Sequence, residues 1–186
     1  TERRARPVAS DGDGGSRHAD GPRPRYTAPM GRAVVVSRTG GPEVLEPRQQ
    51  DPGPPGLGQV RVRVRAAGVN FIDVYFREGR YPSPLPFING QEGAGVVTEL
   101  GSEVTNLKVG DRVAYTSSLG SYAEFAAVPA ARLVKVPDAL SLEQAAAAML
   151  QGMTAHYLLY SSYKLQRGET ALIHAAAGGV GVAGVA

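Results

Sequence analysis

The sequence predicts a small antiparallel β-barrel or β-sandwich followed by the start of an α/β unit. Between residues 30 and 137, short apolar runs are separated by Gly, Pro, Asn and Asp, which is typical of short strands joined by tight turns. Many short strands favour a small barrel or sandwich. After Ser141 an alanine-rich run of helical type begins, and a glycine run follows an apolar stretch near residue 175. Strand, glycine turn and helix are the first half of a βαβ unit.

The strands are expected from their apolar pattern. Residues 60–65 alternate strictly between Val and Arg, so one face of the strand is apolar and the other carries three arginines. We therefore expect a half-buried strand. Further strands are expected at residues 32–36, 94–99, 112–115, 122–128 and 133–136.

Two helices and one more strand are expected in the last third. Ser141 with Gln144 has the form of a capping box, and the helix it starts should run through the alanines. A second helix is expected from near Met153 to Tyr163. Residues 170–174 then predict a buried strand that leads into the glycine run.

The first 29 residues are expected to be a disordered tail. They hold six arginines and four acidic residues, which leave +2 of the net charge of +3, and they have almost no large apolar side chains. A mitochondrial presequence is disfavoured by the four acids and four prolines, and nucleic-acid binding by the lack of interleaved aromatic residues. The first methionine is Met30, so we expect upstream or linker sequence before it and a reading frame that is incomplete at both ends.

Composition excludes several kinds of chemistry. The chain has no cysteine, which removes disulfides, thiolate metal sites and cysteine nucleophiles. No apolar run approaches the roughly 18 residues that span a bilayer, and no signal-peptide core is visible. We expect a cytoplasmic protein without membrane segments whose catalysis uses oxygen and nitrogen side chains or a bound cofactor.

The glycine run predicts a nucleotide site. Ala176, Gly178 and Gly181 take the three positions of the dinucleotide-binding fingerprint, with alanine in place of the first glycine. Backbone N–H groups and the helix dipole would face the phosphates. The alternative is a turn whose glycines only let a helix pack closely.

An earlier segment combines polar and aromatic side chains. Asn70 followed by Asp73 could be the N-cap of a short helix with its reciprocal partner, or part of a reactive site, or both. Tyr75 and Tyr81 could be structural aromatics or hydrogen-bond donors to a substrate.

Together, residues 67–75, 89–95 and 174–181 resemble the zinc-free quinone oxidoreductases of the medium-chain dehydrogenase/reductase superfamily. The resemblance implies a GroES-like catalytic domain at residues 30–150 and the beginning of a Rossmann domain at residues 151–186. Zinc-dependent relatives carry metal ligands where this chain has Asn70 and Gln91-Glu92. An amide is a poor zinc ligand, so no metal is expected.

The resemblance also implies roles for individual residues. It assigns catalytic roles to Asn70, Asp73, Tyr75 and Tyr81, with Asp73 orienting Asn70 or a tyrosine. It implies NADPH as cofactor, a quinone as substrate and a homodimer for the full-length protein. The residues expected to contact the cofactor are Asn70, Gln151, Thr154, Ala177, Gly178, Gly179, Val180 and Gly181. For Thr154 the alternative is a hydroxyl that bonds back to a helix carbonyl.

A site without a Lewis acid suits easily reduced acceptors, because an ordinary ketone needs strong polarisation before it accepts hydride. A quinone becomes aromatic on reduction, so hydrogen-bond donors could suffice. We therefore predict an NADPH:quinone reductase, and keep a zinc-free enone or enoyl reductase and a catalytically silent barrel module as alternatives. Because the ribose and adenine contacts would lie after Ala186, we expect the 186-residue chain alone to be inactive.

Overall fold

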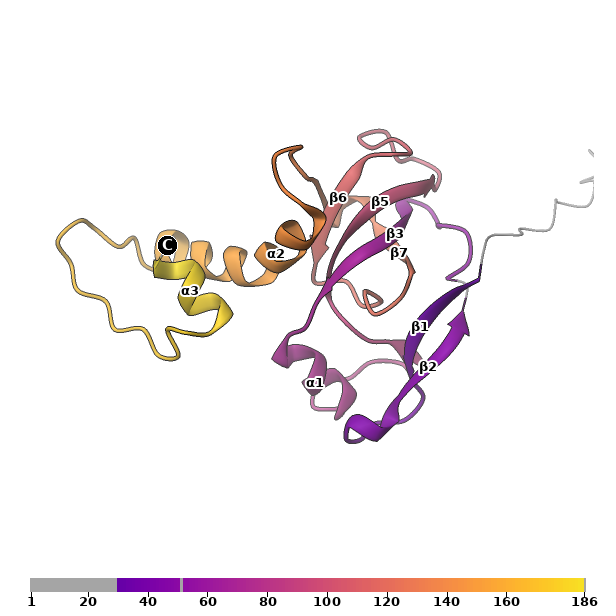
Figure 1. Cartoon of the computed structure of the whole chain (residues 1–186), viewed down its shortest axis with the longest axis horizontal. Helices are drawn as coiled ribbons and strands as arrows, with labels where there is room; N and C mark the ends of the chain where they lie inside the picture. The colour runs from indigo at the N-terminus through magenta and orange to yellow at the C-terminus, as the bar shows by residue number, and fades with distance from the viewer. Residues whose placement is uncertain (1–29, 51, 186) are drawn as a thin grey trace, which may run out of the picture.

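The computed structural model describes residues 30–50 and 52–185, so the predicted disorder of residues 1–29 lies outside the described residues. The described chain forms a lobe of two antiparallel sheets and a helical extension that projects from it (Figure 1). The smaller sheet has the order β2-β1-β4, with β1 at Gly31–Val36, β2 at Leu45–Gln50 and β4 at Phe87–Ile88. The larger sheet has the order β7-β3-β5-β6-β8, with β3 at Gln59–Gly68, β5 at Glu92–Leu100, β6 at Arg112–Thr116, β7 at Phe125–Pro129 and β8 at Leu133–Lys135.

The alternating strand is confirmed as β3, at the centre of the larger sheet. Val60 and Val62 are fully buried, as the pattern predicts. Arg61 is also buried, although the pattern places it on the polar face, and its guanidinium lies 4.5 Å above the ring of Phe125. An aromatic face can cover an arginine in this way.

Two apolar clusters hold the lobe together. The first fills the space enclosed by the larger sheet and includes Val97, Val113 and Tyr115. The second joins the sheet to α2 (Leu142–His156), through contacts of Ala145 and Ala146 with strands β5 and β6. The first half of α2 is therefore anchored on the sheet, and its second half carries the chain outward (Figure 1).

The expected second helix is not separate. The helix α2 continues directly into a π-helical segment, Tyr157–Ser162, because no proline interrupts it and Gly152 is tolerated inside it. The short helix α3 (Gly179–Val185) then packs against α2.

The strand expected at residues 170–174 is absent from the structure. These residues have no regular secondary structure, and Leu172 is 85% exposed. A buried strand requires neighbours on its edges, and the part of the chain that the structure describes places no strand beside this one.

Two strands were not expected from the sequence. The strand β2 contains Pro47 and is mostly exposed, which an edge strand tolerates. The strand β4 has two residues, too few for a periodic pattern.

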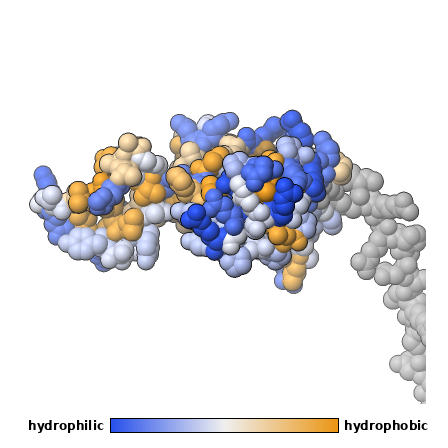
Figure 2. Space-filling view, turned by 90° about the horizontal axis from the view of Figure 1, so that it is seen from below, coloured by the Kyte–Doolittle hydropathy of each residue, from blue (hydrophilic) through white to orange (hydrophobic). Residues whose placement is uncertain are grey.

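No helix in the described ranges is long and apolar enough to cross a membrane. Exposed apolar side chains gather instead on the helical extension, where Figure 2 shows orange clusters at the end away from the grey segment.

Candidate functional site

Asn70 lies between the end of β3 and the start of α1 (Phe71–Arg77), and it is the N-cap of that helix. Its backbone N–H donates to Asp73 Oδ2 at 2.9 Å, which is the reciprocal half of a capping box. Its side chain makes two further bonds: Nδ2 donates to Glu92 Oε2 at 2.8 Å, and Oδ1 accepts from Gln151 Nε2 at 2.9 Å. Both interpretations of Asn70, as cap and as part of a polar site, are therefore compatible with its geometry.

Glu92 is the first residue of β5 and has no exposed surface. Its second carboxylate oxygen, Oε1, accepts from the backbone N–H of Leu150 at 2.6 Å. The carboxylate thus connects three elements: the β3–α1 junction, β5 and α2. A fully buried carboxylate requires such partners, because an unpaired charge is costly inside a protein.

Asp73 lies in the first turn of α1, three residues after Asn70, and is 3% exposed. The Tyr122 hydroxyl donates to Asp73 Oδ2 at 2.7 Å. Burial raises the pKa of Asp73, and the hydrogen bonds from Tyr122 and from the backbone of Asn70 and Gln91 oppose that rise. Burial, together with the neighbouring Asp73 carboxylate, also raises the pKa of Tyr122, so its proton stays on the phenol.

Tyr75 and Tyr81 form a second cluster at the other end of α1. Their rings meet edge to face with centroids 5.6 Å apart, and the Arg80 guanidinium lies 5.4 Å from the Tyr75 ring centroid. The backbone N–H of Tyr81 donates to the Tyr75 carbonyl at 3.2 Å. The four residues expected to be catalytic therefore occupy one short helix and the loop after it, in two clusters.

The glycine turn lies next to this site, because it packs against Gln151. A Cβ atom built on Gly179 would lie 2.6 Å from Gln151 Cγ, so the turn passes directly over the side chain that contacts Asn70. Gly181 is equally close to Ala176, with 2.5 Å between its hypothetical Cβ and the Ala176 Cα. At Gly178 a Cβ would meet only the Ala175 carbonyl, at 3.1 Å, so this side of the turn is open.

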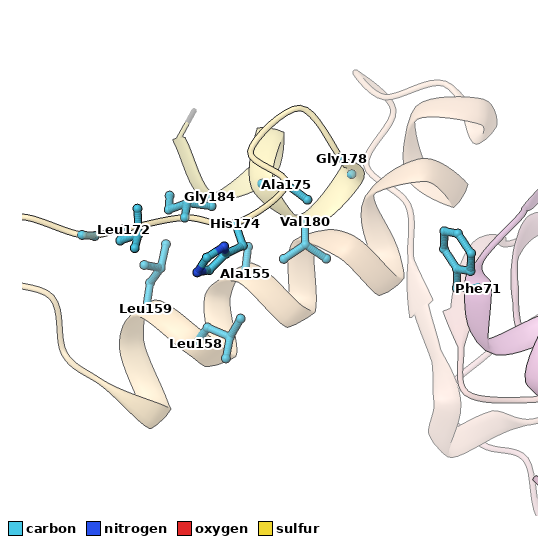
Figure 3. A pocket seen from close by; sticks show the side chains of 14 residues that line it. Phe71, Ala155, Leu158, Leu159, Leu172, His174, Ala175, Gly178, Val180 and Gly184 are labelled. Carbon is cyan, nitrogen blue, oxygen red and sulfur yellow. The ribbon is translucent and has the colours of Figure 1, made fainter.

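An apolar cavity of about 580 Å³ lies between the end of α2 and the glycine turn. In Figure 3, Leu158, Leu159 and His174 surround it, and Phe71 stands apart on α1. The Thr154 Oγ1 donates to the Leu150 carbonyl at 2.7 Å, which is the back-bonded geometry given above as the alternative for this residue.

Two residues of this arrangement were missed as site residues. The sequence places Glu92 only at a position where zinc-dependent relatives carry metal ligands, and Tyr122 only at the start of a strand. The signal for Glu92 was present, because a carboxylate between glycines at the start of an apolar strand is unusual. Nothing local marks Tyr122, whose contact with Asp73 joins residues 49 positions apart.

Metal-ligand side chains do not cluster in the described residues: no group of three or more His, Cys, Asp or Glu side chains there could hold an ion.

Comparison with known proteins identifies the fold and the family. Residues 56–138 match the alcohol dehydrogenase GroES-like domain. The chain is 55% identical over 155 residues to a quinone oxidoreductase of Pseudomonas aeruginosa, covering 82% of this chain and 48% of that protein. It is 45% identical over 160 residues to a 2-haloacrylate reductase of a Burkholderia species, covering 82% of this chain and 48% of that protein.

A solved structure agrees with these matches. The Escherichia coli quinone oxidoreductase complexed with NADPH superposes with a TM-score of 0.78 at 44% identity, covering 81% of this chain and 47% of that one. The chain thus spans about half the length of the relatives it matches. With its GroES-like sheet and the glycine turn that follows it, the chain belongs to the quinone oxidoreductase family of the medium-chain dehydrogenases/reductases.

Proposed function

We propose that this chain is the substrate-side half of an NADPH-dependent quinone reductase. The observation that carries the proposal is the position of Gln151, which hydrogen-bonds Asn70 at 2.9 Å and lies against the glycine turn at Gly179. The polar groups suited to a substrate and the turn suited to a cofactor therefore meet at one side chain.

We assign the cofactor contacts to Asn70, Gln151 and Thr154 and to the turn at 177–181. The glycines of the turn differ in a way that fits a dinucleotide. Gly181 has no room for a side chain because Ala176 packs against it, whereas Gly178 leaves the turn open on its outer side. Close packing at the third glycine and open backbone at the second are what the fingerprint requires. Bound there, NADPH would supply the hydride.

The substrate side uses hydrogen-bond donors. Asn70 Nδ2 carries a second hydrogen besides the one donated to Glu92, and Tyr75 and Tyr81 carry phenol hydrogens. Such donors stabilise negative charge that develops on a substrate oxygen. Asp73 touches Asn70 and Tyr122 and acts as a positioning residue.

A second candidate is reduction of an activated alkene. The relationship to a 2-haloacrylate reductase favours it, since both acceptors place negative charge on oxygen after hydride addition. Quinone reduction remains the first choice because of the closer relationship to the Pseudomonas protein.

The remaining assignments rest on the resemblance alone. We propose a catalytic domain at residues 30–150, a cofactor domain that begins at residue 151, a site without zinc, and a cytoplasmic homodimer for the complete protein.

The test is an extended protein in which the C-terminal half of the Pseudomonas relative follows residue 186. We expect this protein to oxidise NADPH with 1,4-benzoquinone. Tyr75→Phe should lower kcat by roughly 10²-fold with little change in the NADPH dissociation constant, because one donor to the developing oxyanion is lost. Gly178→Val should instead raise that dissociation constant, because a side chain would block the open side of the turn.

Tyr160→Phe is the matched control, because Tyr160 is an exposed tyrosine on the helical extension, away from the two sheets. Equal loss of NADPH affinity in Tyr75→Phe and Gly178→Val, with an unchanged rate in the bound complex, would contradict the proposal.

A further inference from the structure

The carboxylate of Glu92 begins a hydrogen-bonded chain that continues through the side-chain amides of Asn70 and Gln151. Glu92 Oε2 accepts from Asn70 Nδ2 at 2.8 Å, and Asn70 Oδ1 accepts from Gln151 Nε2 at 2.9 Å. The other carboxylate oxygen is held by the Leu150 N–H at 2.6 Å. Glu92 is fully buried, so the carboxylate end of this chain has no contact with solvent.

The direction of the chain follows from what each group can donate. A carboxylate only accepts hydrogen bonds, whereas an amide has a donor end and an acceptor end. Asn70 must therefore turn its nitrogen to Glu92 and its oxygen to Gln151.

Gln151 by itself would choose the opposite direction. In the orientation that serves Asn70, its oxygen faces the Ala147 carbonyl at 2.7 Å and Glu92 Oε1 at 3.3 Å, which are both acceptors. Turning the amide over would give its nitrogen these two acceptors but would set its oxygen against Asn70 Oδ1. In either orientation the Gln151 amide leaves an oxygen facing another oxygen, so Gln151 does not fix the direction of Asn70. That direction is set by the Glu92 carboxylate, which requires the nitrogen end of the Asn70 amide.

Gly68 makes the contact possible. It is the register partner of Glu92 across β3 and β5, and a Cβ atom there would fall on the Glu92 carboxylate. Only a residue without a side chain lets the carboxylate reach Asn70.

We propose that Glu92 is a positioning residue that sets the direction of the Asn70–Gln151 amide chain and thereby turns the donor end of Asn70, not its carbonyl, to the reacting oxygen. The consequence for the rate rests on the proposed function. Reversal of the chain would exchange the two ends of the Asn70 amide, and a carbonyl oxygen repels a substrate oxygen that gains charge.

The substitution Glu92→Gln should reverse the chain and keep the fold. The Leu150 N–H requires an oxygen, so the new amide nitrogen must face Asn70. Asn70 Oδ1 then accepts from the new amide, and Asn70 Nδ2 donates to the Gln151 oxygen. The Gln151 nitrogen becomes free to donate to the Ala147 carbonyl. Every group in the reversed chain has a partner, so no unsatisfied buried group is created.

The direction is read by NMR in the isotope-labelled 186-residue chain. In the parent, the side-chain amide protons of Asn70 should show nuclear Overhauser contacts to the γ protons of Glu92. In Glu92→Gln these contacts should move to the γ protons of Gln151. Gly68→Ala should abolish the contact to residue 92 by displacing the carboxylate, and Glu46→Gln, on the edge strand β2, should change nothing.

In the extended protein, Glu92→Gln should lower kcat by roughly 10²-fold, the cost of one oxyanion donor. Two results would overturn the proposal. One is that the Asn70 amide protons of Glu92→Gln keep their nuclear Overhauser contacts to residue 92. The other is that these contacts move to Gln151 while kcat stays at the parental value. If the parent reduces no quinone although Glu92→Gln reverses the chain, the proposed function fails and the positioning role stands.

Discussion

Single residues at the candidate site serve more than one neighbour. Glu92 accepts from a side chain and from a helix N–H, and Asp73 Oδ2 accepts from both Asn70 and Tyr122. Hydrogen bonds to a buried charged group contribute more than neutral ones, and an unmade one costs the full desolvation of the group. The geometry of Asn70 is therefore determined from two sides, by Asp73 through its backbone and by Glu92 through its side chain.

The raised pKa of Asp73 predicts a pH-dependent stability. Because burial raises the pKa above its ordinary value of 3.8, the folded chain binds the proton more tightly than the unfolded chain does. The carboxyl therefore contributes stability that is present below pH 3.8 and is lost as the pH rises through the raised folded pKa. The free energy of unfolding of the parent, measured relative to Asp73→Asn by urea titration, should fall between pH 4 and pH 7. A difference that stays constant or grows with pH would show that the hydrogen bonds from Tyr122 and Asn70 outweigh burial.

Part of the site was predictable from the sequence at this scale. The Asn70–Asp73 pair is a local capping pattern, and its geometry follows from spacing along one helix turn. The contact of Glu92 with Leu150 joins residues 58 positions apart. It depends on where α2 lies on the sheet, which no local pattern of residues specifies.

At the scale of elements, periodicity predicted the strands that bury one face. The valines of β3 are an example, since Val60 and Val62 lie in the main apolar cluster and Val64 packs against it. The edge strand β2 has no buried face to leave a pattern, and the strand expected at residues 170–174 has the right composition but no neighbour to pair with. Composition thus indicates a strand only where the fold supplies its partners.

The helix α2 offers a prediction about its start. The Gln144 N–H donates to Ser141 Oγ at 3.1 Å, and the Ser141 N–H donates to Gln144 Oε1 at 2.9 Å. Ser141→Ala removes the side-chain cap and should lower the free energy of unfolding by about 1 kcal/mol. Urea unfolding followed by circular dichroism measures this loss.

Ser141→Asn is the matched control, because asparagine caps as well as serine does. A loss in Ser141→Asn as large as that in Ser141→Ala would mean that the capping hydrogen bond is not what stabilises this helix end.

At the scale of the whole molecule, the two ends of the described chain differ in how well they cover their apolar side chains. The sheets enclose a core, whereas the helical extension leaves a concentration of apolar groups open to solvent (Figure 2). They are Met153, Tyr157, Leu158, Tyr160, Tyr163, Leu165, Leu172, Val182 and Val185. A large exposed apolar surface is unusual for a soluble monomer, and this chain spans about half the length of the relatives it matches.

This difference predicts where an apolar dye binds. Leu172 is 85% exposed and lines the cavity of about 580 Å³ between α2 and the glycine turn. Leu172→Asp should lower the fluorescence of anilinonaphthalene sulfonate bound to the 186-residue chain, because it places a charge in that cavity at little cost to folding. Leu57→Asp is the control, since Leu57 is 67% exposed but lies just before β3 on the lobe formed by the two sheets, away from the cavity. Equal fluorescence losses in the two variants would mean that the dye recognises scattered apolar side chains. A loss confined to Leu172→Asp would locate the open apolar surface beside the turn that we assign to the cofactor.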